Sequence, residues 1–304
     1  MSPAPSARAP RTSGLSALVP AMAVLASLTV AASAQQAVFR STVDLVPVFA
    51  TVTGADGSFT TGLSKDDFTV LDNGRPQEIV SFSDEAQTIS VSIILDTSGS
   101  MATARERVFA AAGVFLDNLR PDDRAMIGSL VYQGPPFSSD RARLRSSMEL
   151  LPRDPGSPVW MALDRAVTSL GPETNRRVIV IYTDGQNQDL SQFRALRVSE
   201  STLRARIEAA GVMVYAIGFE GVSIGGGLKT IARRSGGRAT DLGQADDLAA
   251  ALTAVADELH HQYLLGFTPT VLDGRTHRIE VRLRKPALTV RAREAYVAAK
   301  SAPR

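Results

Sequence analysis

Four short apolar runs, rich in β-branched residues, recur along the middle of the chain and alternate with stretches of helical periodicity. Apolar residues repeat every three to four positions over 108–119 and over 203–210. Strands that are apolar on both faces and alternate with helices are typical of a parallel sheet covered on both sides. We therefore expect a doubly wound α/β fold with a mainly parallel sheet. The expected strands span 89–95, 125–131, 178–182 and 212–219, and two further helices are expected over 159–170 and 245–260.

The segments on either side of this region follow a period of two, which is typical of half-buried strands. Apolar residues alternate with less apolar ones from Val46 to Val52, and with charged ones over 277–285 and 288–293. We expect the last two runs to pair as a hairpin and to pack with residues 38–83, so that both ends of the chain form one small β module. The arginines of this hairpin are interpreted as a solvated face rather than as a surface for nucleic acid or anionic lipid.

The first 34 residues have the pattern of a secretory signal peptide. Arg8 and Arg11 give a basic start, an almost wholly apolar run follows, and a small-x-small cleavage site ends it at Ala34. A membrane anchor is the alternative, but the many alanines would make this run a weak spanning helix. We expect cleavage, which would leave a mature chain of 35–304 in the periplasm or the extracellular space, with no integral membrane segment.

The composition excludes several classes of site. The chain has 304 residues and no cysteine, which rules out disulfides, cysteine-ligated zinc and a cysteine nucleophile. Its 33 basic and 31 acidic side chains leave a formal net charge of +2, too small for a field that recruits nucleic acid. Because Arg8 and Arg11 lie in the expected leader, the mature chain would carry 31 basic and 31 acidic side chains.

The strongest chemical signal is an Asp-x-Ser-x-Ser motif, which directly follows the expected strand 89–95 and precedes a helix. Its members Asp96, Ser98 and Ser100 can turn their oxygens toward one point, and another expected strand ends similarly, in Asp184. Ligands of open α/β sheets lie beyond the carboxyl ends of the strands. A carboxylate with neutral hydroxyls suits a hard cation such as Mg²⁺. Ordinary helix capping and an Asp-Gly turn are the alternative interpretation of the same residues.

This motif resembles the metal-ion-dependent adhesion site of von Willebrand factor type A domains, which have a Rossmann-like fold. In that family a threonine from a later loop and an aspartate after another strand complete the site. The resemblance places the aspartate on Asp184 and the threonine on Ser157, a departure that keeps the hydroxyl but loses the methyl group that restricts the rotamer. It implies a site for Mg²⁺, or for Mn²⁺ or Ca²⁺. The implied metal ligands are Asp96, Ser98, Ser100, Ser157 and Asp184.

The flanking segments resemble those of a bacterial group of secreted proteins related to von Willebrand factor type A domains. The segment from Asp66 to Phe82 resembles the N-terminal part of this group, and residues 262–267 with the arginine-rich hairpin resemble its C-terminus. The resemblance spans nearly all of 38–297. It divides the chain into a signal peptide over 1–34, an N-terminal β segment over 35–86, a type A domain over 87–262 and a C-terminal hairpin segment over 263–304.

The resemblance implies an exported protein that binds or adheres to another protein through a metal, rather than an enzyme. The partner would present an acidic residue to the metal. A structural domain whose site binds no metal is one alternative, which Ser157 favours. A metal-dependent hydrolase with Ser98 as nucleophile is the other, but the three histidines lie far along the chain from the motif and no Gly-x-Ser-x-Gly elbow is present.

Overall fold

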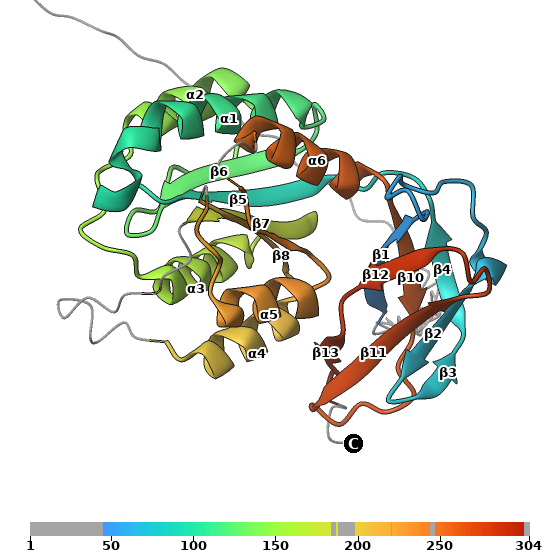
Figure 1. Cartoon of the computed structure of the whole chain (residues 1–304). Helices are drawn as coiled ribbons and strands as arrows, with labels where there is room; N and C mark the ends of the chain where they lie inside the picture. Colours follow the sequence, from blue (N-terminus) through green and yellow to red (C-terminus); the bar gives the residue numbers. More distant parts are fainter. Residues whose placement is uncertain (1–44, 184–186, 188–197, 220, 244–246, 301–304) are drawn as a thin grey trace, which may run out of the picture. The chain divides into compact units, whose positions relative to one another are not determined.

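A parallel sheet of five strands forms the middle of the chain (Figure 1). Its strands are β5 (Ile89–Leu95), β6 (Arg124–Ser129), β7 (Arg176–Thr183), β8 (Met213–Gly218) and β9 (Ala239–Thr240), in the order β6-β5-β7-β8-β9. β5 coincides residue for residue with the apolar run at 89–95, and every one of its side chains is buried. Burial on both faces explains why a continuous apolar run, rather than an alternating one, marks this strand. The computed structural model describes residues 45–183, 187, 198–219, 221–243 and 247–300.

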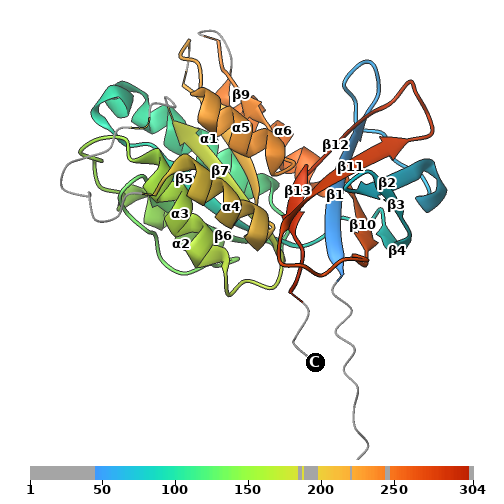
Figure 2. The same cartoon turned by 90° about the horizontal axis from the view of Figure 1, so that it is seen from below.

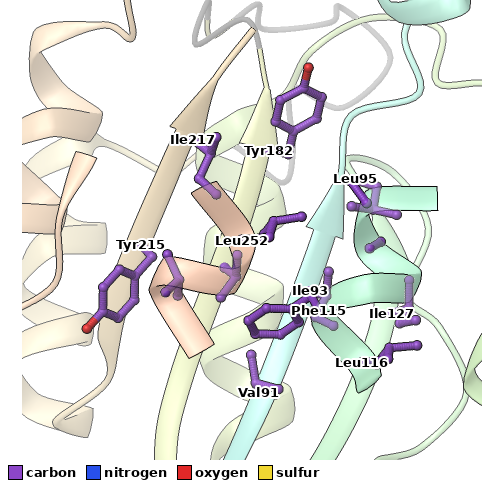
Figure 3. Close-up of a cluster of buried hydrophobic side chains, with 14 of the residues drawn as sticks. Val91, Ile93, Leu95, Phe115, Leu116, Ile127, Tyr182, Tyr215, Ile217 and Leu252 are labelled. Atoms are coloured by element: carbon purple, nitrogen blue, oxygen red, sulfur yellow. The ribbon is translucent and has the colours of Figure 1, made fainter. Parts of the chain in front are cut away.

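Helices cover both faces of this sheet (Figures 1 and 2). One face carries α1 (Arg105–Asn118), α2 (Arg141–Glu149) and α6 (Leu248–His260), and the other carries α3 (Val159–Leu170), α4 (Glu200–Ala210) and α5 (Gly226–Arg234). Figure 3 shows Phe115 of α1 and Leu252 of α6 among the apolar side chains that pack against Val91 and Ile93 of β5. The predicted doubly wound α/β fold is confirmed.

Both ends of the described chain contribute to two antiparallel sheets, which enclose an apolar core of their own. Strand β1 pairs with β10 and β12, and β11 pairs with β2 and β13. The predicted β module built from the two flanking segments is therefore confirmed. The first sheet contains β1 (Val46–Thr53), β4 (Ile79–Ser83), β10 (Gln262–Phe267) and β12 (Thr289–Ala292), and the second contains β2 (Phe68–Asp72), β3 (Arg75–Gln77), β11 (Thr276–Leu283) and β13 (Ala295–Val297).

The predicted C-terminal hairpin is wrong. β11 and β12 lie in different sheets, where β11 pairs with β2 and β12 pairs with β1. A period of two fixes which face of a strand is apolar, but it does not select the partner strand. The interpretation of the arginines as a solvated face is correct for Arg278 and Arg282 of β11, which are exposed. It is wrong for Arg291 of β12, which binds the buried Glu258.

One expectation about the ends of the chain falls outside the described residues. The predicted signal peptide, residues 1–34, belongs to this part of the sequence. In the described part of the chain, no helix combines the length and the apolar character that crossing a membrane requires.

Candidate metal centre

Asp96 directly follows β5 at the carboxyl edge of the parallel sheet, and only 2% of its surface is exposed. Its Oδ1 accepts a hydrogen bond from the Ser98 backbone N–H at 2.9 Å, and its Oδ2 accepts one from Thr183 Oγ1 at 2.7 Å. Because Thr183 is the last residue of β7, the Asp96 carboxylate joins the ends of the neighbouring strands β5 and β7. Hydrogen bonds that a carboxylate accepts favour its ionised form, which is the form that binds a cation.

The hydroxyl oxygens of Ser98 and Ser100 lie 3.1 Å apart. Adjacent ligands of an octahedral cation with bonds of about 2.1 Å are separated by about 3 Å, so this spacing fits two ligands of one ion. Ser98 is buried at the N-cap of the 3₁₀ helix η2 (Gly99–Ala104). Its side chain accepts no capping hydrogen bond from the backbone N–H groups of this helix, all of whose residues are described. Ordinary N-capping therefore does not account for Ser98.

Ser157 lies in the loop before α3 and is buried, with 4% of its surface exposed. The nearby Asp154 fixes this loop against the motif through one backbone and one side-chain hydrogen bond. The Asp154 N–H donates to the Thr97 carbonyl at 3.3 Å, and the Thr97 N–H donates to Asp154 Oδ2 at 3.2 Å. The structure thus brings the Ser157 loop beside the Asp-x-Ser-x-Ser motif, across 57 residues of sequence between Thr97 and Asp154.

Asp154 is a buried carboxylate that the sequence motifs do not predict as a site residue. Besides the Thr97 N–H, it accepts hydrogen bonds from Ser129 Oγ at 2.7 Å, from the Leu130 N–H at 3.0 Å and from the Val131 N–H at 3.2 Å. Ser129 ends β6, so one carboxylate holds together the loop after β5, the loop after β6 and the loop before α3. Asp154 therefore positions the candidate site without belonging to its proposed ligands.

Arg165 of α3 supports the same arrangement by contacting the end of β6 and the residue that follows it. Its guanidinium donates hydrogen bonds to the carbonyls of Ser129 at 2.8 Å and Leu130 at 3.2 Å. Burial lowers the pKa of Arg165, and the negative charge of Asp154 acts against this shift. The pair thus places a cation and a carboxylate on either side of the segment that follows β6.

Asp184, the last candidate ligand, lies outside the described residues. Residues close to it on both sides are described. Thr183 binds Asp96, and Asn187 Oδ1 accepts a hydrogen bond from the Trp160 backbone N–H at 3.1 Å, in the first turn of α3. The two described residues nearest to Asp184 in sequence, Thr183 and Asn187, thus contact the motif and the first turn of α3.

The candidate ligands offer only oxygen atoms, from three serine hydroxyls and two carboxylates. Such a set fits Mg²⁺ or Mn²⁺, which bind through a few protein oxygens and retain water. Ca²⁺ takes about six to eight oxygens and would need more ligands from water or a partner. Within the described ranges, no cluster of three or more histidine, cysteine, aspartate or glutamate side chains is placed to hold a metal ion. The candidate set contains a single described acid, Asp96, and does not depend on such a cluster.

Several solved structures resemble this chain in fold at low sequence identity. An aerotolerance-related membrane protein from Bacteroides fragilis is 19% identical, with 56% of this chain and 98% of that chain covered and a TM-score of 0.45. The vWF domain of the type V pili tip protein Mfa5 from Porphyromonas gingivalis is 12% identical, with 57% and 95% covered and a TM-score of 0.46. A von Willebrand factor type A protein from Catenulispora acidiphila is 11% identical, with 86% and 76% covered and a TM-score of 0.47. No curated protein matches the chain by sequence.

A family match in sequence covers the parallel sheet. The profile of the von Willebrand factor type A domain matches residues 90–255, which run from β5 into α6. The matched span includes the Asp-x-Ser-x-Ser motif, Ser157 and Asp184, and it is more than half of the 304-residue chain. This protein therefore belongs to the von Willebrand factor type A family, as the motif and its setting predicted.

Proposed function

We propose that this chain is an exported binding protein that docks an acidic residue of a partner protein through a divalent cation. Domains of this family mediate protein–protein interactions and often bind a metal. The observation that carries the proposal is the 2.7 Å hydrogen bond between Thr183 Oγ1 and Asp96 Oδ2. It joins the two strand ends that carry the acidic candidate ligands, Asp96 and Asp184.

Asp96, Ser98, Ser100, Ser157 and Asp184 are the residues proposed to hold the cation, with Mg²⁺ or Mn²⁺ preferred. When bound, the ion supplies an electrophilic centre with an exchangeable position for a carboxylate oxygen. The protein contributes three neutral hydroxyls and two carboxylates, so the local negative charge stays low enough to admit one more anion. The buried Asp154 supports the proposal because it connects the loop after β5, the loop after β6 and the loop before α3.

Calorimetric titration of the full chain with Mg²⁺, Mn²⁺ and Ca²⁺ tests the metal site. We expect Asp96→Ala to abolish binding while the far-UV circular dichroism spectrum is retained, and Asp140→Ala, which removes an exposed cap of α2, to leave binding unchanged. Ser157→Ala should weaken binding, and Ser157→Thr should bind at least as tightly as the natural chain. Fluorescence of Trp160, three residues from Ser157, gives a second readout. Unchanged metal affinity in Asp96→Ala would refute the site.

Partner docking is tested separately, with the immobilised chain exposed to the extracellular fraction of the source cells. The proposal requires that capture occurs in Mg²⁺, disappears in EDTA and is absent for Asp96→Ala. Capture that survives either change would show that docking uses another surface.

The export proposal is supported by the pattern of the first 34 residues: a basic start, an apolar run and a small-x-small site. N-terminal sequencing of the protein recovered outside the cytoplasm should find Gln35 as the first residue. Recovery of the chain from the cytoplasm with its leader intact would contradict export.

A structural domain that binds no metal is a second candidate function. Both oxygens of Asp96 already accept hydrogen bonds, from the Ser98 N–H and from Thr183 Oγ1, and these contacts satisfy a buried carboxylate without an ion. The serine at position 157 favours the same interpretation. The calorimetric titration separates the two, because a structural domain would give no heat of metal binding in the natural chain or in Ser157→Thr.

The proposal assigns no catalytic role to Ser98. The three histidines are engaged elsewhere: His260 lies 2.9 Å from Asp123, His277 lies 2.9 Å from Asp72, and His261 stacks on Phe59. A general base of this kind is therefore not placed beside Ser98. Screening for phosphatase and esterase turnover tests the hydrolase alternative, which metal-dependent turnover lost in Ser98→Ala would favour.

A further inference from the structure

A cleft of about 650 Å³ lies at the end of the parallel sheet opposite to the candidate metal centre. Its walls include Pro47 and Phe49 of β1, Arg176 and Arg177 at the start of β7, Met213 of β8, and Arg293. Asp96 contacts Thr183 at the other end of β7, seven residues from Arg176, which corresponds to about 23 Å along a strand. The cleft is therefore separate from the candidate metal centre.

Arg293 brings an uncompensated cation to this cleft. Its Nε is buried and has no hydrogen-bond partner among the described residues. The ring of Tyr296 lies 5.9 Å from the guanidinium carbon and is a neutral group. Burial lowers the pKa of Arg293 to about 10, so the side chain still carries its charge at neutral pH. A buried charge without an opposite partner is costly, and an anionic ligand would remove that cost.

Two further arginines of the cleft add positive charge. Arg176 is 8% exposed; it donates to the Leu259 carbonyl at 3.0 Å and lies over the Phe49 ring at 4.2 Å, while its Nε has no described partner. Arg177 donates to backbone carbonyls, including that of Ala210 at 3.1 Å. These acceptors are neutral, so they satisfy donors without cancelling the charge.

The acids near the cleft are already paired. Glu208 is the sole acid among the described lining residues, and Arg234 binds its carboxylate at 2.7 Å. Glu258, whose charge reaches Arg176, is bound by Arg291. The described lining therefore contains three arginines, Arg176, Arg177 and Arg293, and a single acid that is already paired, which leaves a surplus of positive charge.

We propose that this cleft binds an organic anion, whose carboxylate or phosphate group contacts Arg293 and whose apolar body lies against Phe49 and Pro47. The guanidinium group has planar paired donors that match both kinds of oxyanion. The volume falls in the range of about 300–1,000 Å³ that is usual for small-molecule sites, and it exceeds the needs of an inorganic ion. Such a site would give the protein a small-molecule input in addition to protein docking.

Calorimetric titration of the full chain with four probes tests the site: hexanoate, hexyl phosphate, hexanol and inorganic phosphate. We expect at least one of the two hexyl anions to bind about tenfold or more tightly than hexanol, because a charged hydrogen bond is lost in the alcohol. The stronger of the two anions identifies the headgroup. The affinity should not change in EDTA, which separates this site from the proposed metal centre.

Arg293→Met keeps most of the side-chain volume and removes the charge, and Arg282→Met is the matched control on an exposed arginine of β11. We expect anion affinity to fall about tenfold or more in Arg293→Met and to stay unchanged in Arg282→Met. Arg293→Lys, which keeps a charge without the paired donors, should give an intermediate affinity.

Four results would overturn the proposal: neither anion binds, hexanol binds as tightly as the stronger of the two hexyl anions, inorganic phosphate binds as tightly as that anion, or Arg293→Met binds it like the natural chain. The first three need no variant, so they decide the proposal even if Arg293→Met does not fold.

Discussion

Asp154→Ala should destabilise the protein more than most single substitutions, although Asp154 is not a proposed metal ligand. The carboxylate accepts hydrogen bonds from three backbone N–H groups, those of Thr97, Leu130 and Val131, and from the hydroxyl of Ser129. The Thr97 hydroxyl can donate its one proton to the Pro152 carbonyl at 2.7 Å instead. It is therefore not counted among the groups that lose their acceptor in Asp154→Ala.

The magnitude follows from the groups that would lose their acceptor. Each buried donor left without a partner costs about 1–3 kcal/mol, and the Ser129 hydroxyl can rotate toward another acceptor. Three orphaned backbone N–H groups therefore cost about 3–9 kcal/mol, and water that enters the space of the deleted carboxylate reduces this to about 3–5 kcal/mol. A loss of this size is a large fraction of a typical stability of about 5–15 kcal/mol.

Urea unfolding followed by circular dichroism measures the change, with Asp140→Ala as a control. Asp140 also accepts a backbone hydrogen bond, from the Arg143 N–H at 3.0 Å, but it is an exposed helix cap, for which we expect a loss of about 1 kcal/mol. If Asp154→Ala lowers the free energy of unfolding by no more than Asp140→Ala does, the carboxylate does not hold the three loops. Asp154→Asn should also be destabilising, because an amide nitrogen would face donors where a carboxylate oxygen now accepts.

Two further changes test other parts of the structure. Burial opposes the ionisation of Asp123, but hydrogen bonds led by the one to His260 outweigh it and hold the pKa of Asp123 below its ordinary value of 3.8. The ionised Asp123 therefore stabilises the folded state fully above pH 3.8, and this stabilisation is lost as the pH falls through the pKa of Asp123 in the folded state. The difference in free energy of unfolding between the natural chain and Asp123→Asn should accordingly shrink on acid titration. Gly237→Ala should destabilise the protein because a Cβ there would lie 1.9 Å from the Val214 carbonyl oxygen, whereas Gly226→Ala, with no atom within 4 Å, should be tolerated; equal melting temperatures of the two variants would contradict this.

The parallel sheet was predictable because its strands are buried on both faces and so carry their signal in consecutive residues. β5 was predicted residue for residue. Helix α2 was missed, since only Leu144, Ser147 and Met148 of its nine residues are buried and the rest of its sequence is polar. A helix at the edge of a core buries few side chains, so its sequence contains too few apolar residues to show the helical period of 3.6.

The candidate site was predictable only where its residues follow a strand in sequence. Asp96 and Ser98 belong to a local motif, and their burial is consistent with it. Asp154 is an isolated acid in a turn-forming segment, and its role depends on contacts with Thr97 and Ser129, which are 57 and 25 residues away. Nothing in a single sequence indicates which distant donors a carboxylate will meet, so a residue that positions the loops is found only in the structure.

The flanking sheets are joined to the parallel sheet through Glu258, near the end of α6. This carboxylate is 1% exposed and accepts hydrogen bonds from Thr51 of β1 at 3.1 Å, from Tyr215 of β8 and from Arg291 of β12. Separating the two parts would expose an ion pair and leave the remaining partners of Glu258 unsatisfied. Because a half-broken buried network is less stable than either an intact or an absent one, the flanking segments and the type A domain should unfold together. The Arg291–Glu258 pair also explains why the alternation in β12 was misleading: its arginine faces inward, toward an acid 33 residues earlier in the chain.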